Sequence, residues 1–411
     1  MRERLLAIAR RPAVRVITLA VAFAVLLLLR RGDTVLVPSV WNEDGDMIVP
    51  DMLHSGLGTL LHPVNGYLVT IPKIIDLIAF AVSATLFPLI NAVLAWLVAI
   101  GVGLAVAFAP TVLRHRTLAA AAVFLVPTDP EVFGIGLYTL WWAGILLLLV
   151  VLWKPDDHRV LTRVLLLVIG GLSSPVILIA APALVVRAVR WRQRSEIVPA
   201  AVGLAVAIVQ GLTLILSTIT GASAAPGSSG AAFAPTMVGD YLAHSWTDSP
   251  RIRVAVGILL LLFLIAGTLL VRSGPRWPAV LIGYLLVALV ILSLARTAGI
   301  ALDPVNAGPR YFFYPFVLIS WFLLWLVTRW RWQPLVALPV AALLLGLANV
   351  APGWSRSNID LHWPEQLRAC AAAEGPFQLT IQAAGHADHV WHVTLPSVDC
   401  ATWLSRDPFN R

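Results

Sequence analysis

The feature that most constrains this chain is a series of apolar runs, each close to the length of a membrane-spanning helix. A helix needs about 20 mostly apolar residues to cross the hydrocarbon core of a bilayer. Hydrophobic residues make up 59% of the 411 residues and charged residues only 12%, whereas soluble domains are about 45–50% apolar. The sequence therefore predicts an all-α polytopic membrane protein.

We predict about eleven membrane-spanning helices from the length and position of these runs. They fall at residues 14–29, 88–109, 116–128, 135–153, 159–172, 174–188, 197–218, 252–272, 277–296, 311–328 and 333–350. The segment 66–86 is interrupted by Pro72, Lys73 and Asp76, so we expect it to lie in the membrane interface rather than to span.

Arginine-rich clusters test this arrangement. They lie at residues 114–116, 154–159, 187–194, 271–276 and 328–332. With eleven spans and an interfacial 66–86, all five fall on the side of the amino terminus, which the positive-inside rule makes cytoplasmic. The net charge of +8 therefore indicates topology in a cytoplasmic membrane, and gives no reason to expect a nucleic-acid partner.

Two units are expected. Residues 1–350 form the transmembrane domain, with a first outer loop at 30–87 and a Gly/Ser/Ala/Pro-rich outer loop at 218–250 that should be flexible. Residues 351–411 form a small external tail with a short helix and strand-like pieces, an α+β pattern.

Cys370 and Cys400, the only cysteines, both lie in this tail. An external tail favours a disulfide between them. Two unrelated thiols remain the alternative.

The densest group of acids lies just after the first span, in "NEDGD", which contains Glu43, Asp44 and Asp46. A solvated turn would explain such a group, because Asn, Asp and Gly favour turns. Apolar residues follow it, however, and the loop is therefore expected to fold against the membrane surface. A partly desolvated carboxylate there can accept a proton or bind a divalent cation.

Several short motifs together resemble the GT-C superfamily of integral-membrane glycosyltransferases, in a bacterial branch. They are "EDGD", "HPVNGYLVTIPK", "PTDPEVFG" followed by "LWW", "LSSP", "GPRYFFYP" and the cysteine-bearing tail. The resemblance implies a sugar carried on a polyprenyl phosphate and transferred to a glycan, lipid or protein acceptor on the outer side of the membrane. It also implies that a first-loop acid is the general base, with Asp44 the first candidate, Glu43 the second, and Asp46 an orienting or metal-binding partner.

The phosphate leaving group of such a donor requires positive charge. Arg310 in "GPRYFF" can bind two phosphate oxygens, with Tyr311 beside it; the alternative is an interfacial anchor formed by the pair. Lys73 can also meet phosphate, although an ion pair with Asp76 is the simpler interpretation.

Four further residues in the first loop are expected to contact substrate: His54, His62, Asn65 and Tyr67. Asp129 and Glu131 of the next outer loop are close enough in principle to complete a metal site with Asp44 or Asp46. Carboxylates alone suit Mg or Mn rather than zinc.

Two other functions stay open at this stage. A transporter or flippase of a polar lipid would place polar residues in the middle of its spans, and Gln210 is one of few such residues. A non-catalytic cell-envelope assembly factor would use the tail to bind a partner. Membrane lipids surround the protein in every case.

Overall fold

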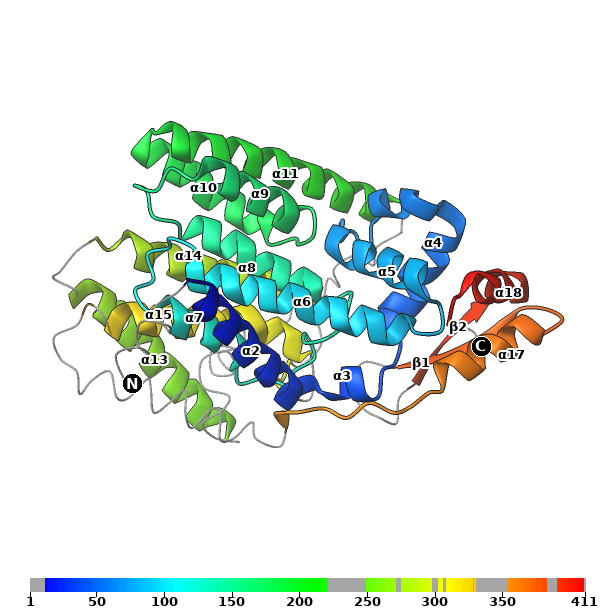
Figure 1. Cartoon of the computed structure of the whole chain (residues 1–411). Coiled ribbons are helices and arrows are strands. Elements are labelled where there is room, and N and C mark those ends of the chain that lie inside the picture. The colour runs from blue at the N-terminus through cyan, green and yellow to red at the C-terminus, as the bar shows by residue number, and fades with distance from the viewer. Residues whose placement is uncertain are drawn as a thin grey trace.

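The computed structural model describes residues 12–220, 249–270, 275–297, 302–305, 308–327, 329, 353–382 and 390–409. Helices dominate these residues (Figure 1). Six of the described helices are long and apolar enough to cross a membrane: Pro12–Arg31, Phe87–Phe108, Arg194–Ile219, Arg251–Leu269, Trp277–Arg296 and Pro309–Leu326. The chain is thus mostly helical, as expected of a polytopic membrane protein, while the count of eleven spans stays a prediction.

The helices of the apolar bundle follow the order expected from the sequence. They are α2 (Pro12–Arg31), α6 (Phe87–Phe108), α7 (Arg116–Phe124), α8 (Thr139–Val151), α9 (Val160–Gly171), α10 (Ile177–Trp191), α11 (Arg194–Ile219), α13 (Pro250–Leu270), α14 (Trp277–Arg296) and α15 (Phe313–Val327). The expected span at 333–350 and most of the loop at 218–250 lie outside the described residues.

Four of the expected spans contain helices that are shorter than a bilayer requires. α7 has 9 residues, α8 has 13, α9 has 12 and α10 has 15. The helix of the run 116–128 ends at Phe124, just before Pro127 and Pro130, because proline disfavours helix both at itself and at the preceding residue. Residues 125–138 instead form a buried loop at one end of the bundle.

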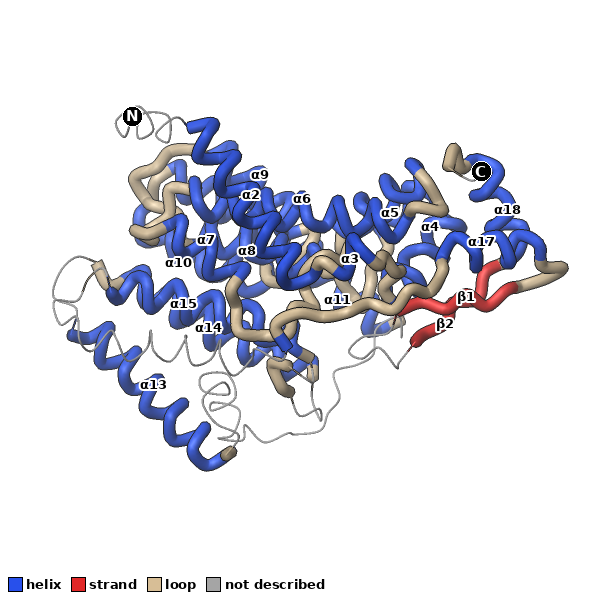
Figure 2. The backbone as a smooth tube through the Cα atoms, turned by 60° about the horizontal axis from the view of Figure 1, so that its bottom comes forward, coloured by secondary structure: helices blue, strands red, loops and turns tan. Residues whose placement is uncertain are grey.

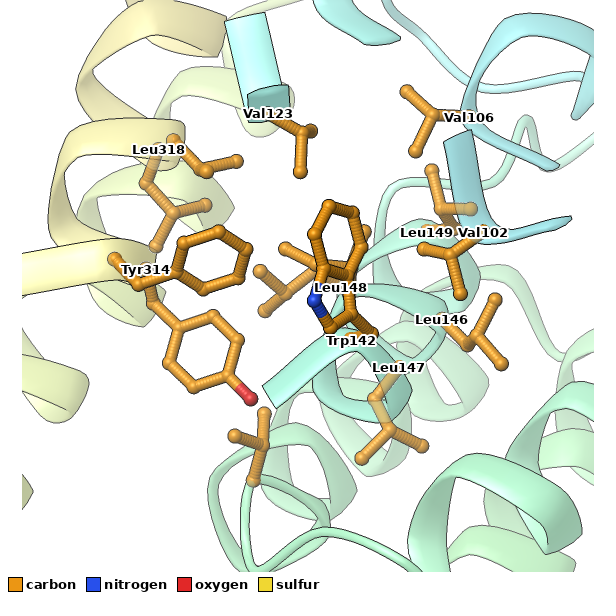
Figure 3. Close-up of a cluster of buried hydrophobic side chains, with 14 of the residues drawn as sticks. Val102, Val106, Val123, Trp142, Leu146, Leu147, Leu148, Leu149, Tyr314 and Leu318 are labelled. Carbon is orange, nitrogen blue, oxygen red and sulfur yellow. The ribbon is translucent and has the colours of Figure 1, made fainter. Parts of the chain in front are cut away.

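The centre of the bundle is α8. Apart from Leu140 and Trp141 at its start, every one of its side chains is buried, as expected for a helix that is apolar all round. Figure 3 shows Trp142 among valines of α6 and α7, with Tyr314 of α15 nearby. Many leucines and isoleucines on α2, α11, α13 and α14 are exposed instead, which fits a surface that faces lipid.

The two ends of the bundle differ in charge. α14 runs from Trp277 at one end to Arg296 at the other, a length of about 30 Å for 20 residues. The end near Arg296 is covered by the first loop and carries its carboxylates. The end near Trp277 carries the arginine-rich loops after α8 and α10, and Arg276 just before α14.

The first loop folds into short helices between the bundle and the tail (Figures 1 and 2). They are α3 (Asp33–Leu36), the π-helical turn η1 (Asp44–Ile48), α4 (Val49–Ser55), the 3-10 helix η2 (Gly56–Leu61) and α5 (Thr70–Val82). Another 3-10 turn, η4 (Pro309–Phe312), precedes α15. α5 has 13 residues and packs against α6 and α8.

The tail contains α17 (Trp363–Ala372), β1 (Phe377–Gln382), β2 (Val390–Leu395) and α18 (Ser397–Arg406). Its strands pair antiparallel, with Phe377 opposite Leu395, and Cys370 and Cys400 form a disulfide between α17 and α18. The buried residues of the tail form one cluster with Val49, Ala79 and Phe87 of the first loop and α6. The tail and the first loop therefore share a core.

Candidate functional site

A cavity of about 150 Å³ opens at the end of the bundle that the first loop covers. The first loop, the start of α8, the turn before α10, the end of α14 and the start of α15 form its walls. The polar and aromatic residues among its lining are Glu43, Asn65, Tyr67, Tyr138, Trp141, Ser174, Ser293, Arg296, Arg310, Tyr311 and Tyr314.

The neighbouring acids Glu43 and Asp44 face different surroundings. Glu43 lines the cavity, whereas Asp44 lines a separate space of about 10 Å³ on the other side of the turn. Consecutive residues of a helix project about 100° apart, so the two side chains leave the backbone in different directions. The π-helical turn that begins at Asp44 adds a residue to the turn, a distortion that is frequent at functional sites.

Burial raises the pKa of Glu43. The positive charge of Arg310 opposes this shift, and the negative charge of Glu131 adds to it. One oxygen of the carboxylate, Oε2, is buried without a hydrogen-bond partner among the described residues. Glu43 is thus a carboxylate whose proton affinity is increased and which has an acceptor position available.

Arg310 is fixed from two sides. Its Nη1 donates to Glu131 Oε1 at 2.5 Å and to the Tyr138 hydroxyl at 3.0 Å. Its backbone N–H donates to Glu131 Oε2 at 3.3 Å. The guanidinium also lies 5.3 Å from the centre of the Tyr311 ring. Two hydrogen bonds from one arginine to one buried carboxylate orient the guanidinium at the cavity wall.

Glu131 reaches this position because arginines of α2 hold the buried loop 125–138. Arg30 donates to the carbonyl oxygens of Phe124, at 2.8 Å, and of Thr128. Arg31 donates to the Pro130 carbonyl at 3.3 Å. Both arginines are completely or almost completely buried, and their hydrogen bonds satisfy backbone carbonyls that would otherwise lack partners.

A second arginine, Arg296, reaches the cavity from the end of α14. Its Nη2 donates to the Asn65 carbonyl at 3.4 Å, and its guanidinium lies 5.3 Å from the centre of the Tyr67 ring. Asn65 and Gly66 both have positive φ, and Val64 and Tyr67 exchange backbone hydrogen bonds around them. This is the geometry for which an Asn-Gly pair is strongly preferred.

Aromatic side chains form the remaining wall. Trp141 lies 5.8 Å from Tyr311 and 5.1 Å from Tyr314, measured between ring centres. The Tyr314 hydroxyl donates to the Trp141 carbonyl at 2.8 Å. The cavity thus combines one carboxylate, two guanidinium groups and a broad aromatic surface.

Asp44 belongs to a buried carboxyl pair with Asp76 of α5. The two side chains are within hydrogen-bonding reach, and burial raises both pKa values. The charge of Glu43 adds to the shift of Asp44, and the charge of Asp44 adds to that of Asp76, whereas the hydrogen bond between them lowers the pKa of Asp44. Asp76 accepts a hydrogen bond from Asn91, whose Oδ1 accepts from the Gly136 N–H at 2.9 Å. Asp44 Oδ1 and Asp76 Oδ2 have no other partner among the described residues, so one shared proton would satisfy both.

The four residues proposed as a metal site do not come together. Asp46 is exposed, Asp44 faces Asp76, Glu131 binds Arg310, and Asp129 pairs with Nε of Arg356 at 2.6 Å. Within the described ranges, no group of three or more His, Cys, Asp or Glu side chains could hold a metal. These residues do not fit the expected site, and dependence on Mg or Mn stays a prediction.

Lys73 lies outside the cavity lining. Its Nζ donates to the carbonyl oxygens of Thr59 and His62 and lies 3.5 Å from Asp51. The expected ion pair with Asp76 is therefore replaced by one with Asp51, and Lys73 holds η2 against α5 instead of facing phosphate.

The four substrate-loop residues divide into two groups. Asn65 and Tyr67 line the cavity. His54 and His62 are exposed outside it, and His62 contacts Asp51 at 2.6 Å.

The polar and aromatic cavity residues that the sequence did not single out are Tyr138, Trp141, Ser174, Ser293, Arg296 and Tyr314. Arg296 had a usable signal, because it lies at the end of a span where arginine is depleted by the positive-inside rule. Tyr138 and Trp141 had none, since aromatic residues are common at the ends of spans.

Comparison with known proteins adds no relative. No protein-family model, no curated protein and no solved structure matches this chain.

Proposed function

We propose that this protein is a glycosyltransferase. It transfers a sugar from a polyprenyl-phosphate donor to a hydroxyl of a glycan, lipid or protein acceptor at the outer face of the cytoplasmic membrane. The resemblance of its motifs to the GT-C superfamily motivates this proposal.

The observation that carries the proposal is the composition of one cavity. Glu43, Arg296 and Arg310 line it together, and they come from the first loop, α14 and η4. A guanidinium binds phosphate oxygens through a planar pair of N–H groups. A carboxylate with a raised pKa is suited to accept a proton. The cavity lies at one end of apolar helices, where a lipid-linked donor would present its phosphate.

The chemistry requires one proton transfer. The acceptor oxygen forms a bond to the anomeric carbon while the bond from that carbon to the phosphate oxygen breaks. The acceptor proton passes to Glu43, and the electron pair leaves with the polyprenyl phosphate. Arg310 and Arg296 stabilise the negative charge that develops on the phosphate. Attack opposite the leaving group inverts the anomeric configuration.

Glu43 suits the role of base better than Asp44. Glu43 lines the cavity, whereas Asp44 is 1% exposed and faces Asp76. A base must come within hydrogen-bonding reach of the proton that it abstracts. We assign Asp44 to the support of the turn that carries Glu43.

Transport is less well supported, because the polar mid-span residue Gln210 has backbone partners. Its side chain exchanges two hydrogen bonds of 3.0 Å with Leu68 and donates to the Gly171 carbonyl at 2.8 Å. Gln210 thereby connects Leu68, which precedes α5, to the end of α9.

The test is the consumption of polyprenyl-phosphate sugars in vesicles, followed by mass spectrometry, with acceptor lipid and divalent cation supplied. Vesicles with the native protein should lose one donor, and vesicles with Glu43→Gln should not. Asp46→Asn is the matched control, because Asp46 belongs to the same motif but is exposed. If the native protein consumes no donor, the proposal is wrong.

A further inference from the structure

A second cavity, of about 410 Å³, lies at the opposite end of the bundle, between α10 and α14. Ligand sites commonly have volumes of about 300–1,000 Å³. It is lined by Val186, Arg187, Arg190, Trp191, Pro275, Arg276, Trp277, Val280 and Leu281. Because α14 separates its two ends by about 30 Å, this cavity is distinct from the one that holds Glu43.

The lining is strongly basic. It contains three arginines and, within the described part of the chain, no carboxylate. Arg190 and Arg276 are exposed, whereas Arg187 is buried. Exposed arginines beside a cavity at the end of membrane helices are typical of sites for anionic lipid head groups.

The buried arginine is held by a buried carboxylate that it shares with a second arginine. Arg187 donates to both oxygens of Glu196 at 2.9 and 2.8 Å, and Arg163 donates to the same oxygens at 2.9 and 3.0 Å. All three side chains are at most 1% exposed. A ligand at this cavity would therefore meet the charge of Arg190 and Arg276, with Arg187 as a fixed support.

Two tryptophans mark the level of the membrane interface here. Trp191 and Trp277 pack edge to face with ring centres 4.9 Å apart. The Arg187 guanidinium lies 4.8 Å from the centre of the first ring and 5.1 Å from that of the second. Tryptophan is enriched at the head-group level of bilayers because its ring is amphipathic.

The cavity changes from polar to apolar along the helices. Arg190 and Arg276 lie at its polar end. Val186 lies about one helical turn back along α10, and Val280 lies one turn into α14. Both valines are exposed, at 61% and 62%. The groove thus offers cations at the head-group level and apolar side chains at the level of the acyl chains.

We propose that this groove binds the phosphate of an anionic phospholipid in the leaflet expected to be cytoplasmic. Arg190 and Arg276 bind the phosphate oxygens, Trp191 and Trp277 pack beside the glycerol region, and an acyl chain lies along Val186 and Val280. Such a lipid would bridge α10 and α14 at the end of the bundle opposite the Glu43 cavity. This inference does not depend on the proposed glycosyl transfer.

The test uses the full-length protein in detergent, with phosphatidylglycerol or phosphatidylcholine added, and native mass spectrometry of the lipid adducts. The native protein should retain phosphatidylglycerol in preference to phosphatidylcholine. Arg190→Gln with Arg276→Gln should reduce the phosphatidylglycerol-bound fraction about tenfold or more.

Arg192→Gln with Arg194→Gln is the matched control. These arginines lie at the same end of the bundle and are exposed, but they do not line the cavity. The control should bind phosphatidylglycerol like the native protein. Thermal midpoints of all three proteins verify that each variant is folded.

Three results would overturn the inference. The first is equal loss of phosphatidylglycerol in both double variants, and the second is equal retention of the two lipids by the native protein. The third is an adduct of inorganic phosphate that forms without lipid and prevents lipid binding, since it would identify a soluble anion as the ligand.

Discussion

At the scale of single residues, two adjacent carboxyl groups have different surroundings. Glu43 faces the cavity with Arg310 nearby, while Asp44 is enclosed with Asp76 and Asn91. The sequence motif indicated that an acid of the first loop matters. It could not indicate which one faces the cavity, because a π-helical turn changes the direction of side chains without a signature in the residue types.

Glu43 determines the expected pH dependence. As the proposed base, it must be deprotonated, so the rate should fall as the pH decreases through its pKa. Burial raises that pKa, and the acid limb should therefore lie above the usual glutamate value of about 4.3. The position of this acid limb can be measured from the rate of donor consumption between about pH 4 and about pH 8.

Arg310→Gln tests whether protonation of Glu43 causes the fall in rate at acid pH. The Arg310 charge lowers the Glu43 pKa, so its removal should move the limb to higher pH and also slow the reaction. A limb that stays in place in this variant would show that Glu43 is not the titrating base.

Asp76→Asn should stabilise the protein near neutral pH. The pKa values of Asp44 and Asp76 are raised in the folded state. At a pH between the usual aspartate pKa and these raised values, the folded state therefore binds more protons than the unfolded state. Stability of the native protein therefore declines as the pH rises through this window. An amide can keep the contacts with Asn91 and Asp44 without the charge, and the gain should be about 1–3 kcal/mol.

Thermal midpoints of the native protein and Asp76→Asn, measured from pH 5 to 8, provide the comparison, with a difference that should grow with pH. Asp46→Asn, which changes an exposed carboxylate, should shift the midpoint little. A lower midpoint for Asp76→Asn than for the native protein would contradict the shared-proton account.

At the scale of helices, each expected span within the described residues contains a helix, but the helix ends often differ from the expected ones. α14 has the expected bounds, because its whole run is uninterrupted. The run 135–153 yields a helix only from Thr139 to Val151. Its first residues belong to a loop that buried Arg30 and Arg31 hold from α2, and such long-range contacts leave no local pattern in the sequence.

A glycine permits the close approach between α8 and α15 at the cavity. A Cβ on Gly144 would overlap the Tyr314 hydroxyl and come within 3.0 Å of Ser174 Oγ. Gly144→Ala should therefore displace Tyr314 from the cavity wall, lower the rate of donor consumption about tenfold or more, and cost about 1–3 kcal/mol of stability.

Gly101→Ala is the control for this substitution. Gly101 lies within α6, and a Cβ there meets nothing within 4 Å, so rate and thermal midpoint should stay close to native. Equal activity of Gly144→Ala and Gly101→Ala would show that the position of Tyr314 is unimportant.

At the scale of the whole molecule, the tail and the first loop pack as one unit. Sequence patterns in residues 351–411 predicted a short helix and strand-like pieces, but not the core that the tail shares with the first loop. Trp363 Nε1 donates to the Ala84 carbonyl at 2.9 Å, and Asp407 accepts from the Thr85 N–H at 2.6 Å. These contacts connect residues that are far apart in the chain, so no local sequence pattern could predict them.

Loss of the disulfide should therefore weaken the first loop as well as the tail. Cys370→Ser with Cys400→Ser removes a link across 30 residues, which should cost about 2–5 kcal/mol. Activity should fall together with the thermal midpoint. Reduction should lower the midpoint of the native protein and leave that of the double variant unchanged; a native midpoint that does not respond to reduction would contradict this role.

The most direct test of the account compares Glu43→Gln with Asp44→Asn in the release of polyprenyl phosphate from the donor that the native protein consumes. Glu43→Gln should lose release almost completely, by the factor of about 10²–10⁴ that a general base contributes. Asp44→Asn should retain a substantial part of it, because Asp44 supports the turn from the other side. Nearly full activity in Glu43→Gln and loss of activity only in Asp44→Asn would show that the cavity has been assigned the wrong base.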